Sequence, residues 1–255
     1  MHAPETDPDF VLSLARGLQV IEAFSDSRDG LTVSELAART NLSRAAVRRI
    51  LITLESLGYA NRKGTTFHLT SRILRLGFSF ATSDSLAVAA GPLLDQLGAL
   101  IHESCSVGVL ENRQVVYIAR SAPSRVMTID LRVGSRLPAF YTSLGRVLLT
   151  GLSPADLEKN LAETDLTPLT PKTITDRALL REAIRHAHAD GYALVDEELE
   201  VGLRSIAVPV VSRSGEVIAA MNSGVHAARV SAAELLERIL PPLRDHAKLL
   251  EQVLP

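Results

Sequence analysis

Three arginines stand at helical spacing directly after a serine. Arg44, Arg48 and Arg49 follow Ser43, and a separation of four residues places Arg44 and Arg48 on the same face of a helix. A guanidinium group donates forked hydrogen bonds to phosphate oxygens and to guanine edges. From residue 39 to residue 75 the sequence has eight Lys or Arg and one acidic residue. Such a local excess of positive charge indicates a nucleic-acid-binding surface.

Two predicted helices must position these arginines. Apolar residues recur at i, i+3, i+4 spacing in residues 33–37 and again in residues 47–54, which gives each segment one buried face. The turn between them contains Asn41, which tolerates a left-handed backbone, and Ser43, which can cap the second helix. This is the spacing of a helix-turn-helix motif. A further helix is expected over residues 10–24, with an apolar face made of Val11, Leu14, Leu18, Ile21 and Phe24.

A predicted hairpin follows the second helix. Residues 59–62 and 66–70 have strand-like composition and flank Lys63-Gly64-Thr65, whose basic tip suits a phosphate group. The alternative is an ordinary helical hairpin with solvated arginines. The turn length, the hairpin and the segregated charge favour instead a winged helix-turn-helix on double-stranded DNA. The residues expected at the DNA are Ser43, Arg44, Ala45, Ala46, Arg48, Arg49, Arg62 and Lys63.

Charge divides the chain unevenly. Residues 1–83 hold ten basic and eight acidic side chains, whereas the remaining residues hold seventeen and twenty-one. No apolar run is long enough to span a bilayer, and the lone Cys105 excludes an internal disulfide, so a cytoplasmic protein is expected. We predict a DNA-binding domain over residues 1–70, a linker helix over residues 71–83 and a second domain over residues 84–255.

The second domain is predicted to be an α+β domain. Hairpins are expected within residues 105–120 and 206–225, with another strand at 126–133, so the sheet should be antiparallel and flanked by helices. Because proline interrupts helical hydrogen bonding, a new helix start or a kink is expected at Gly91-Pro92, and a kink at Pro241-Pro242. One face of the sheet then stays available for a pocket.

The motifs of both domains resemble those of the IclR-type bacterial transcriptional regulators. The resemblance lies in LTVSELAARTNLSRAAVRRILITLESLGY, in VGSRLPAFYTSLGRVLL and in DGYALVDEELEVGLRSIAVPVVSRSGEVIAAMN. It implies a winged helix-turn-helix, a linker helix and a GAF-like effector-binding domain, assembled as a homodimer or homotetramer. The stretches DEELEVGLRSIAVPV and AAMNSGVHAAR resemble the subgroup that controls aromatic-acid catabolism, in the protocatechuate, 4-hydroxybenzoate and β-ketoadipate pathways.

The resemblance also implies where a small effector binds. The implied pocket residues lie at a turn before a helix and at two strand ends, and they are Leu137, Ser143, Leu144, Ser205, Asn222 and Gly224. The sequence departs from the family here, because Ser205 stands where many members have Cys, and Asn222 and Gly224 stand where Ser is often found. The location of the pocket therefore carries over, whereas the identity of the ligand does not.

Side chains near this turn suit an organic acid. Thr142 and Ser143 offer hydroxyl groups at the start of a predicted helix, where negative charge is favoured. Arg204 or Arg146 could add a charge-assisted hydrogen bond. Tyr141 could form an apolar wall, although it could equally be a core residue. An aromatic acid or a dicarboxylate is the expected effector, with no cofactor.

Other classes of protein remain as alternatives. As an enzyme the chain could use Cys105, but a lone cysteine at a strand start is more often a small buried hydrophobe. His186 and His188 point to different faces of a helix and make a poor metal pair. No phosphate loop, nucleophile elbow or zinc-type Cys/His set is present, so no catalytic or metal-binding residue is predicted. A ligand-free DNA-binding protein and an IclR-type regulator of another carbon source, such as glyoxylate, stay open.

Overall fold

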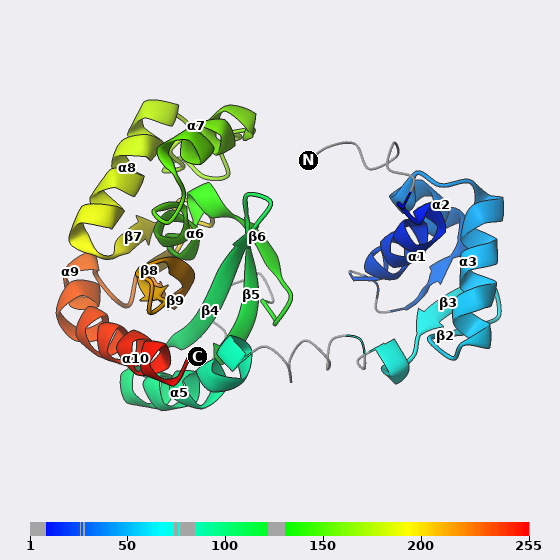
Figure 1. The fold of residues 1–255 in the computed structure, drawn as a ribbon, viewed down its shortest axis with the longest axis horizontal. Coiled ribbons are helices and arrows are strands. Elements are labelled where there is room, and N and C mark those ends of the chain that lie inside the picture. Colours follow the sequence, from blue (N-terminus) through cyan, green and yellow to red (C-terminus); the bar gives the residue numbers. More distant parts are fainter. Residues whose placement is uncertain are drawn as a thin grey trace. The chain divides into compact units, whose positions relative to one another are not determined.

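The computed structural model describes residues 9–25, 27, 29–73, 76, 85–121 and 131–254. The chain divides into two compact units, residues 1–83 and residues 84–255, drawn in blue to cyan and in green to red in Figure 1. Of the predicted linker helix, residues Ser71–Ile73 form a short 3-10 turn (η2). Apart from Leu76, residues 74–84 lie outside the described residues, so the linker helix stays a prediction.

The N-terminal unit is a small helical domain with a three-stranded antiparallel sheet. Its helices are α1 (Leu12–Glu22), α2 (Val33–Thr40) and α3 (Arg44–Ser56), and its strands are β1 (Leu31–Thr32), β2 (Ala60–Lys63) and β3 (Thr66–Leu69). The strand order β1-β3-β2 adds a first strand that was not predicted, because two residues are too short for a periodic signal. Leu36, Val47, Leu51 and Phe67 fill the core and fix α2, α3 and the β2–β3 hairpin together.

The predicted apolar face of α1 is only partly buried within the unit. The helix buries Val20, and Phe24 just beyond it is buried too, whereas Val11, Leu14 and Leu18 are 58%, 61% and 47% exposed. The helix is apolar on two sides, so periodicity alone could not decide which side faces the core. The face with Leu14 and Leu18 is left without a partner within the described part of the unit.

The C-terminal unit is built on a six-stranded antiparallel sheet with the order β6-β5-β4-β9-β8-β7. The strands are β4 (Ser104–Glu111), β5 (Gln114–Ser121), β6 (Arg136–Pro138), β7 (Ala193–Asp196), β8 (Leu203–Val211) and β9 (Val217–His226). Both predicted hairpins are present as β4–β5 and β8–β9. The edge strands β6 and β7 were missed because they are short. The predicted strand at 126–133 is not seen in residues 131–133, and its earlier part lies outside the described residues.

Helices cover both faces of this sheet (Figure 1). They are α5 (Ser85–Ile101), α6 (Ser143–Leu149), α7 (Pro154–Glu163), α8 (Arg177–Asp190), α9 (Ala232–Glu234) and α10 (Leu240–Val253), with a 3-10 turn η3 at Ala139–Tyr141. One buried cluster joins α5 and α10 to one face of the sheet, and a second joins α6 and α8 to the other. The predicted α+β class, with an antiparallel sheet flanked by helices, is confirmed.

The structure bears on both proline predictions. No new helix begins near Pro92, since α5 runs through it. The helix buries Ala90 before the proline and Leu94 and Leu97 after it. Packing of one continuous apolar face therefore outweighs the hydrogen bond that Pro92 cannot donate. At Pro241-Pro242 the prolines occupy the first turn of α10, where no helical donor is needed. A π-helical turn at Leu235–Ile239 directly precedes them, so the regular α-helix is interrupted next to the predicted position.

Candidate nucleic-acid interface and ligand pocket

Local hydrogen bonds fix the start of α3, the helix that carries the arginines. Asn41 ends α2 with a left-handed φ of 55°, and the Ser43 hydroxyl accepts a hydrogen bond from the Ala46 N–H at 3.2 Å. Thr32 and Glu35 form a capping box at the start of α2. The predicted turn and cap are therefore present, and they set the direction in which the first turn of α3 projects.

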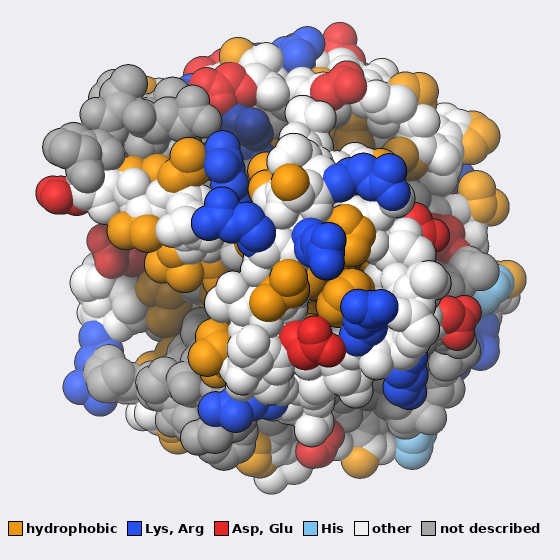
Figure 2. Space-filling model, turned by 90° about the vertical axis from the view of Figure 1, so that its right-hand side faces the viewer, with side chains coloured by type: hydrophobic (Ala, Val, Ile, Leu, Met, Phe, Trp, Pro, Cys, Tyr) orange, Lys and Arg blue, Asp and Glu red, His pale blue; other side chains and the backbone are white. Residues whose placement is uncertain are grey.

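The predicted DNA-contacting side chains lie on the surface of this unit. Arg44, Arg48 and Arg49 are exposed on α3, and Lys63 is exposed at the end of β2. Arg44 Nη2 donates to Ser34 Oγ at 2.6 Å. Figure 2, which looks onto the side where α3 lies in Figure 1, shows Lys and Arg side chains gathered across that face. No acidic partner neutralises these four cations among the described residues, so their charge is available to phosphate.

The other residues predicted to contact DNA differ in exposure and in the hydrogen bonds they already make. Ser43 and Ala45 are exposed, whereas Ala46 is half-buried. Arg62 Nε donates to the Gly64 carbonyl oxygen at 2.9 Å, which folds the side chain back onto the tip of the wing. Lys63 therefore offers a freer charge to phosphate than Arg62 does.

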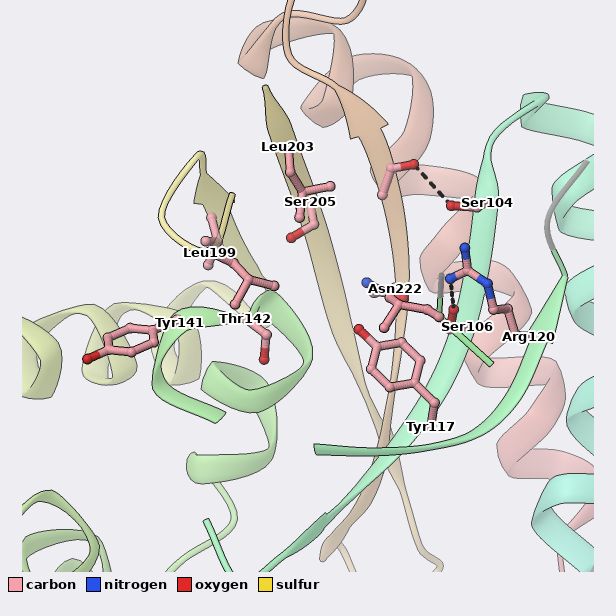
Figure 3. A pocket seen from close by; sticks show the side chains of 13 residues that line it. Ser104, Ser106, Tyr117, Arg120, Tyr141, Thr142, Leu199, Leu203, Ser205 and Asn222 are labelled. Atoms are coloured by element: carbon pink, nitrogen blue, oxygen red, sulfur yellow. Dashed lines mark hydrogen bonds between the residues drawn. The ribbon is translucent and has the colours of Figure 1, made fainter. Parts of the chain in front are cut away.

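A pocket opens on the α6 side of the sheet in the C-terminal unit. In the ligand-free structure the centre of a water-sized sphere can occupy about 30 Å³ of this space, so the cavity is narrow. Its described lining residues are Ser104, Ser106, Tyr117, Arg120, Leu131, Tyr141, Thr142, Val195, Leu199, Leu203, Ser205, Asn222 and Gly224. Figure 3 shows side chains from β4, β5, β8 and β9 facing Thr142 and Leu199 across this space.

Strand register explains the polar floor of the pocket. Ser106 pairs with Arg120 on β5 and with Asn222 on β9, so these three residues form one row across the sheet. The next row on the same face joins Ser104 to Gly224 and Gly224 to Ser205. Pairing between distant strands thus brings hydroxyl, amide and guanidinium groups to one surface.

The electrostatics of this floor favour an anion that also has hydroxyl groups. Arg120 is half-buried, and its Nη1 donates to Ser106 Oγ at 3.2 Å, which leaves further donors of the fork unused by any described partner. Burial raises the pKa of Tyr117 to about 12, so its phenol stays protonated at neutral pH. The site can therefore hold a carboxylate at Arg120 and exchange hydrogen bonds with neutral polar groups around it.

The structure brings together five of the nine residues predicted for the pocket. These are Tyr141, Thr142, Ser205, Asn222 and Gly224. The ring of Tyr141 extends away from the cavity (Figure 3), although the residue lies at its boundary. Leu137, Ser143 and Leu144 are buried and are not among the described residues that line the cavity. Ser143 is fully buried, so it belongs to the core around α6 rather than to the surface a ligand would touch.

Neither arginine considered from the sequence lines the cavity. Arg204 Nε lies 2.7 Å from Asp196 Oδ1, and its Nη1 donates to the Val230 carbonyl oxygen at 2.6 Å. Arg146 is paired with Glu198 and is buried. The cation among the described lining residues is instead Arg120. The sequence did not predict Arg120 as a pocket residue, nor Ser104, Ser106 and Tyr117. The alternation of Ser104 and Ser106 in an otherwise apolar strand was the signal that could have found this floor.

The predicted start of α6 is also a weaker anion site than expected. The helix has seven residues, and the Thr142 hydroxyl accepts the Gly145 N–H at 3.0 Å. One of the helix's free amide donors is thus already taken by the cap. The charge that attracts an anion must come mainly from Arg120.

Groups considered for catalysis or metal binding are occupied or inert. Burial raises the pKa of the Cys105 thiol to about 12, so the nucleophilic thiolate is not populated at neutral pH. On the exposed face of α8, His186 Nε2 lies 3.0 Å from Glu182 Oε1. The described residues contain no group of three or more His, Cys, Asp or Glu placed to hold a metal ion. No helix in the described part of the chain is long and apolar enough to cross a membrane.

These two sites define a class of protein. A winged helix-turn-helix with exposed arginines, in one chain with a sheet domain that holds a cationic pocket, is a ligand-responsive DNA-binding regulator. Residues 13–64 match the IclR helix-turn-helix domain, and residues 78–252 match the bacterial transcriptional regulator IclR C-terminal domain. The chain belongs to the IclR family, which confirms the resemblance noted in its motifs.

Similar proteins include regulators with names from aromatic-acid metabolism. The Pca regulon regulatory protein of Pseudomonas putida is 45% identical over 238 residues, 93% of this chain and 82% of that protein. The p-hydroxybenzoate hydroxylase transcriptional activator of Acinetobacter baylyi is 38% identical over 96% of this chain and 92% of its own length. A crystal structure of an IclR homologue complexed with 4-hydroxybenzoate, from Microbacterium hydrocarbonoxydans, has a TM-score of 0.81 at 26% identity, covering 94% of this chain and 98% of that one.

Proposed function

We propose that a small carboxylate from aromatic-acid catabolism binds the pocket of the C-terminal unit and controls how this IclR-type regulator acts at its operator. The observation that carries the proposal is the row of Arg120, Ser106 and Asn222 on the floor of the pocket. Arg120 suits a carboxylate, and its polar neighbours suit a ring hydroxyl or a keto oxygen. The name of the similar p-hydroxybenzoate hydroxylase transcriptional activator supports a hydroxybenzoate. Protocatechuate and a β-ketoadipate-like dicarboxylate are added because the motifs resemble the subgroup that controls those pathways.

A thermal-shift series on the full chain tests this proposal. 4-Hydroxybenzoate, protocatechuate, β-ketoadipate and glyoxylate would each be added over a concentration range. A ligand that binds the folded state must raise the melting temperature, and the rise grows with ligand concentration above Kd. A rise with at least one of the first three supports an aromatic-pathway effector. A rise with glyoxylate alone would point to another carbon source, and no rise with any of them would contradict the proposed pocket.

Filling the pocket should abolish effector binding without harming the fold. Gly224 lines the cavity, and a Cβ added there meets its nearest neighbours, Leu203 and Ser104, at 3.8 Å, which is ordinary contact. Gly224→Ala should therefore bind effector more weakly, and Gly224→Val, which also suits a strand, should lose binding by more than about tenfold. Calorimetry would measure effector affinity, with operator affinity as the control. Wild-type effector binding by Gly224→Val would show that the ligand lies elsewhere.

We further propose that the chain acts in the cytoplasm as a homodimer or homotetramer on palindromic or repeated half-sites. One recognition helix contacts only a few base pairs, so specificity requires two copies about one DNA turn apart. The exposed Leu14 and Leu18 on α1, with Val11 directly before the helix, offer an apolar surface for a second copy.

The double variant Leu14→Glu/Leu18→Glu should therefore weaken assembly. Two carboxylates on a closely packed apolar surface face desolvation and mutual repulsion. Light scattering at micromolar concentration should show a smaller species. Operator affinity should fall by more than about tenfold, because the two DNA-binding units are no longer joined and cannot bind the two half-sites together. The matched substitution Leu179→Glu, at another exposed leucine on α8, should change neither. A wild-type that is monomeric yet binds its operator with full affinity would contradict this assembly.

A further inference from the structure

Arg146 and Glu198 form an ion pair in the interior of the C-terminal unit. Their side chains are 4% and 7% exposed, and Arg146 Nη2 lies 2.5 Å from Glu198 Oε2. The same guanidinium donates through Nε to the Phe140 carbonyl oxygen at 3.1 Å. Arg146 is not among the residues that line the pocket, so it is not placed to touch a ligand. A buried pair of this kind adds little net stability compared with apolar residues of similar size.

The two partners of Arg146 belong to two separate pieces of the pocket wall. Phe140 lies in η3, two residues before Thr142, and Glu198 directly precedes Leu199. Thr142 and Leu199 both line the cavity. Figure 3 shows them beside each other on one side of the pocket, with Ser106 and Arg120 on the opposite side. One side chain thus joins two wall segments that are far apart in sequence.

The loop that carries Leu199 is held from its other side as well. Thr173 Oγ1 donates to the Glu198 carbonyl oxygen at 2.6 Å, and the Ile174 N–H donates to Glu198 Oε2 at 3.3 Å. Lys172 Nζ lies 2.6 Å from Glu197 Oε1. Glu197 itself has a φ of 58°, a left-handed conformation that needs support from its surroundings. Residues 197–202 form the turn between the paired strands β7 and β8, which the Glu197 N–H closes by donating to the Leu203 carbonyl oxygen at 2.7 Å. The contacts from Arg146, Lys172, Thr173 and Ile174 hold this turn from outside the hairpin.

We propose that Arg146 is a positioning residue for the ligand pocket. By joining the Phe140 carbonyl to Glu198, it fixes the spacing between the Thr142 turn and residues 197–202, so that Thr142 and Leu199 form one wall opposite Arg120. The planar guanidinium fork can hold both partners at defined angles, which a lysine ammonium cannot. The inference rests on the proposed function for the statement that this wall contacts an effector.

Arg146→Lys tests the link with the buried charge retained. Effector affinity should fall by about three- to tenfold, because the lysine can hold Glu198 or the Phe140 carbonyl but not both in the original geometry. Operator affinity without effector should stay within about twofold, since the change lies in the C-terminal unit and leaves the residues of α3 unaltered. The matched control is Arg181→Lys at the exposed Arg181–Glu158 pair, which should change neither quantity.

A second variant removes both charges. Arg146→Met/Glu198→Met leaves no unpaired buried charge, so the full chain should melt near the wild-type temperature. Its effector affinity should fall by more than about tenfold because the two wall segments are no longer joined. Wild-type effector affinity in either variant would overturn the proposal. Should the double variant fail to fold, Arg146→Lys decides the question alone.

Hydrogen exchange on the ligand-free chain separates this inference from the proposed function. Arg146→Lys should speed amide exchange both at residues 142–145 and at residues 197–203, whereas Arg181→Lys should affect neither. This result is expected whatever ligand the pocket takes. If the wild type binds none of the carboxylates but exchange rises at both segments, the proposed function fails and the link stands. Unchanged exchange at residues 197–203 would contradict the link itself.

Discussion

The triple variant Arg44→Ala/Arg48→Ala/Arg49→Ala is expected to lose more than about 100-fold in affinity for its operator. Each arginine is exposed in the first two turns of α3, where side chains reach base edges and flanking phosphates. One such contact contributes about 1–3 kcal/mol, so three contacts near the middle of that range exceed a hundredfold even if they are only partly additive. None of the three packs in the core, so the fold should be retained.

The measurement is an equilibrium titration with DNA selected from a random library by the wild-type chain. Lys63→Ala is the contrasting variant, because its charge in the wing should contact phosphate alone. It should weaken binding to all sequences and reduce the slope of log affinity against log salt by about one. Circular dichroism would confirm that each variant is folded. Unchanged operator affinity in the folded triple variant would show that α3 is not the helix at the DNA.

Arg120→Met is expected to lower effector affinity by about 10- to 100-fold. It removes the cation among the described pocket residues, and a hydrogen bond to a charged group contributes about 1.5–3 kcal/mol. Arg120→Lys should recover part of the affinity because the charge returns without the fork. Operator binding in the absence of effector should stay near the wild-type value in both variants.

Arg204→Lys is the control for this experiment. Arg204 is the arginine that the sequence suggested, but the structure directs it to Asp196 and to backbone carbonyl groups outside the cavity. Calorimetric titration with the effector found by thermal shift should therefore show little change in Arg204→Lys. A large loss of effector affinity in Arg204→Lys, with wild-type affinity in Arg120→Met, would show that the ligand binds beside Arg204, as the sequence suggested.

The DNA-binding elements could be predicted from sequence because their signals are local. Three local features predicted the motif: the left-handed turn at Asn41, the cap at Ser43 and the apolar stripe of α3. All lie within residues 41–54, and each is present in the structure. The hairpin of the wing follows at once. Which side of α1 the unit buries could not be predicted, because that helix has apolar residues on more than one face.

The pocket could be predicted only in part because its residues meet through pairing of distant strands. Ser106 and Asn222 are neighbours in register but lie more than a hundred positions apart in sequence. A single sequence carries no information on that register beyond the alternation in each strand. The family resemblance predicted Ser205, Asn222 and Gly224. Arg120 could be placed in the pocket only once the pairing of β4 with β5 was known. Likewise, Arg146 has suitable chemistry for a ligand contact, but burial with Glu198 gives it a different partner.

The most direct test of the whole account is reciprocal linkage in the full chain. Effector affinity would be measured by calorimetry with and without saturating operator DNA, and operator affinity with and without saturating effector. If the pocket controls the DNA-binding unit, each ligand must change the affinity of the other by the same factor. We expect a factor of at least about five, the lower end of typical couplings. Tight binding of both ligands with a factor of one would contradict the account.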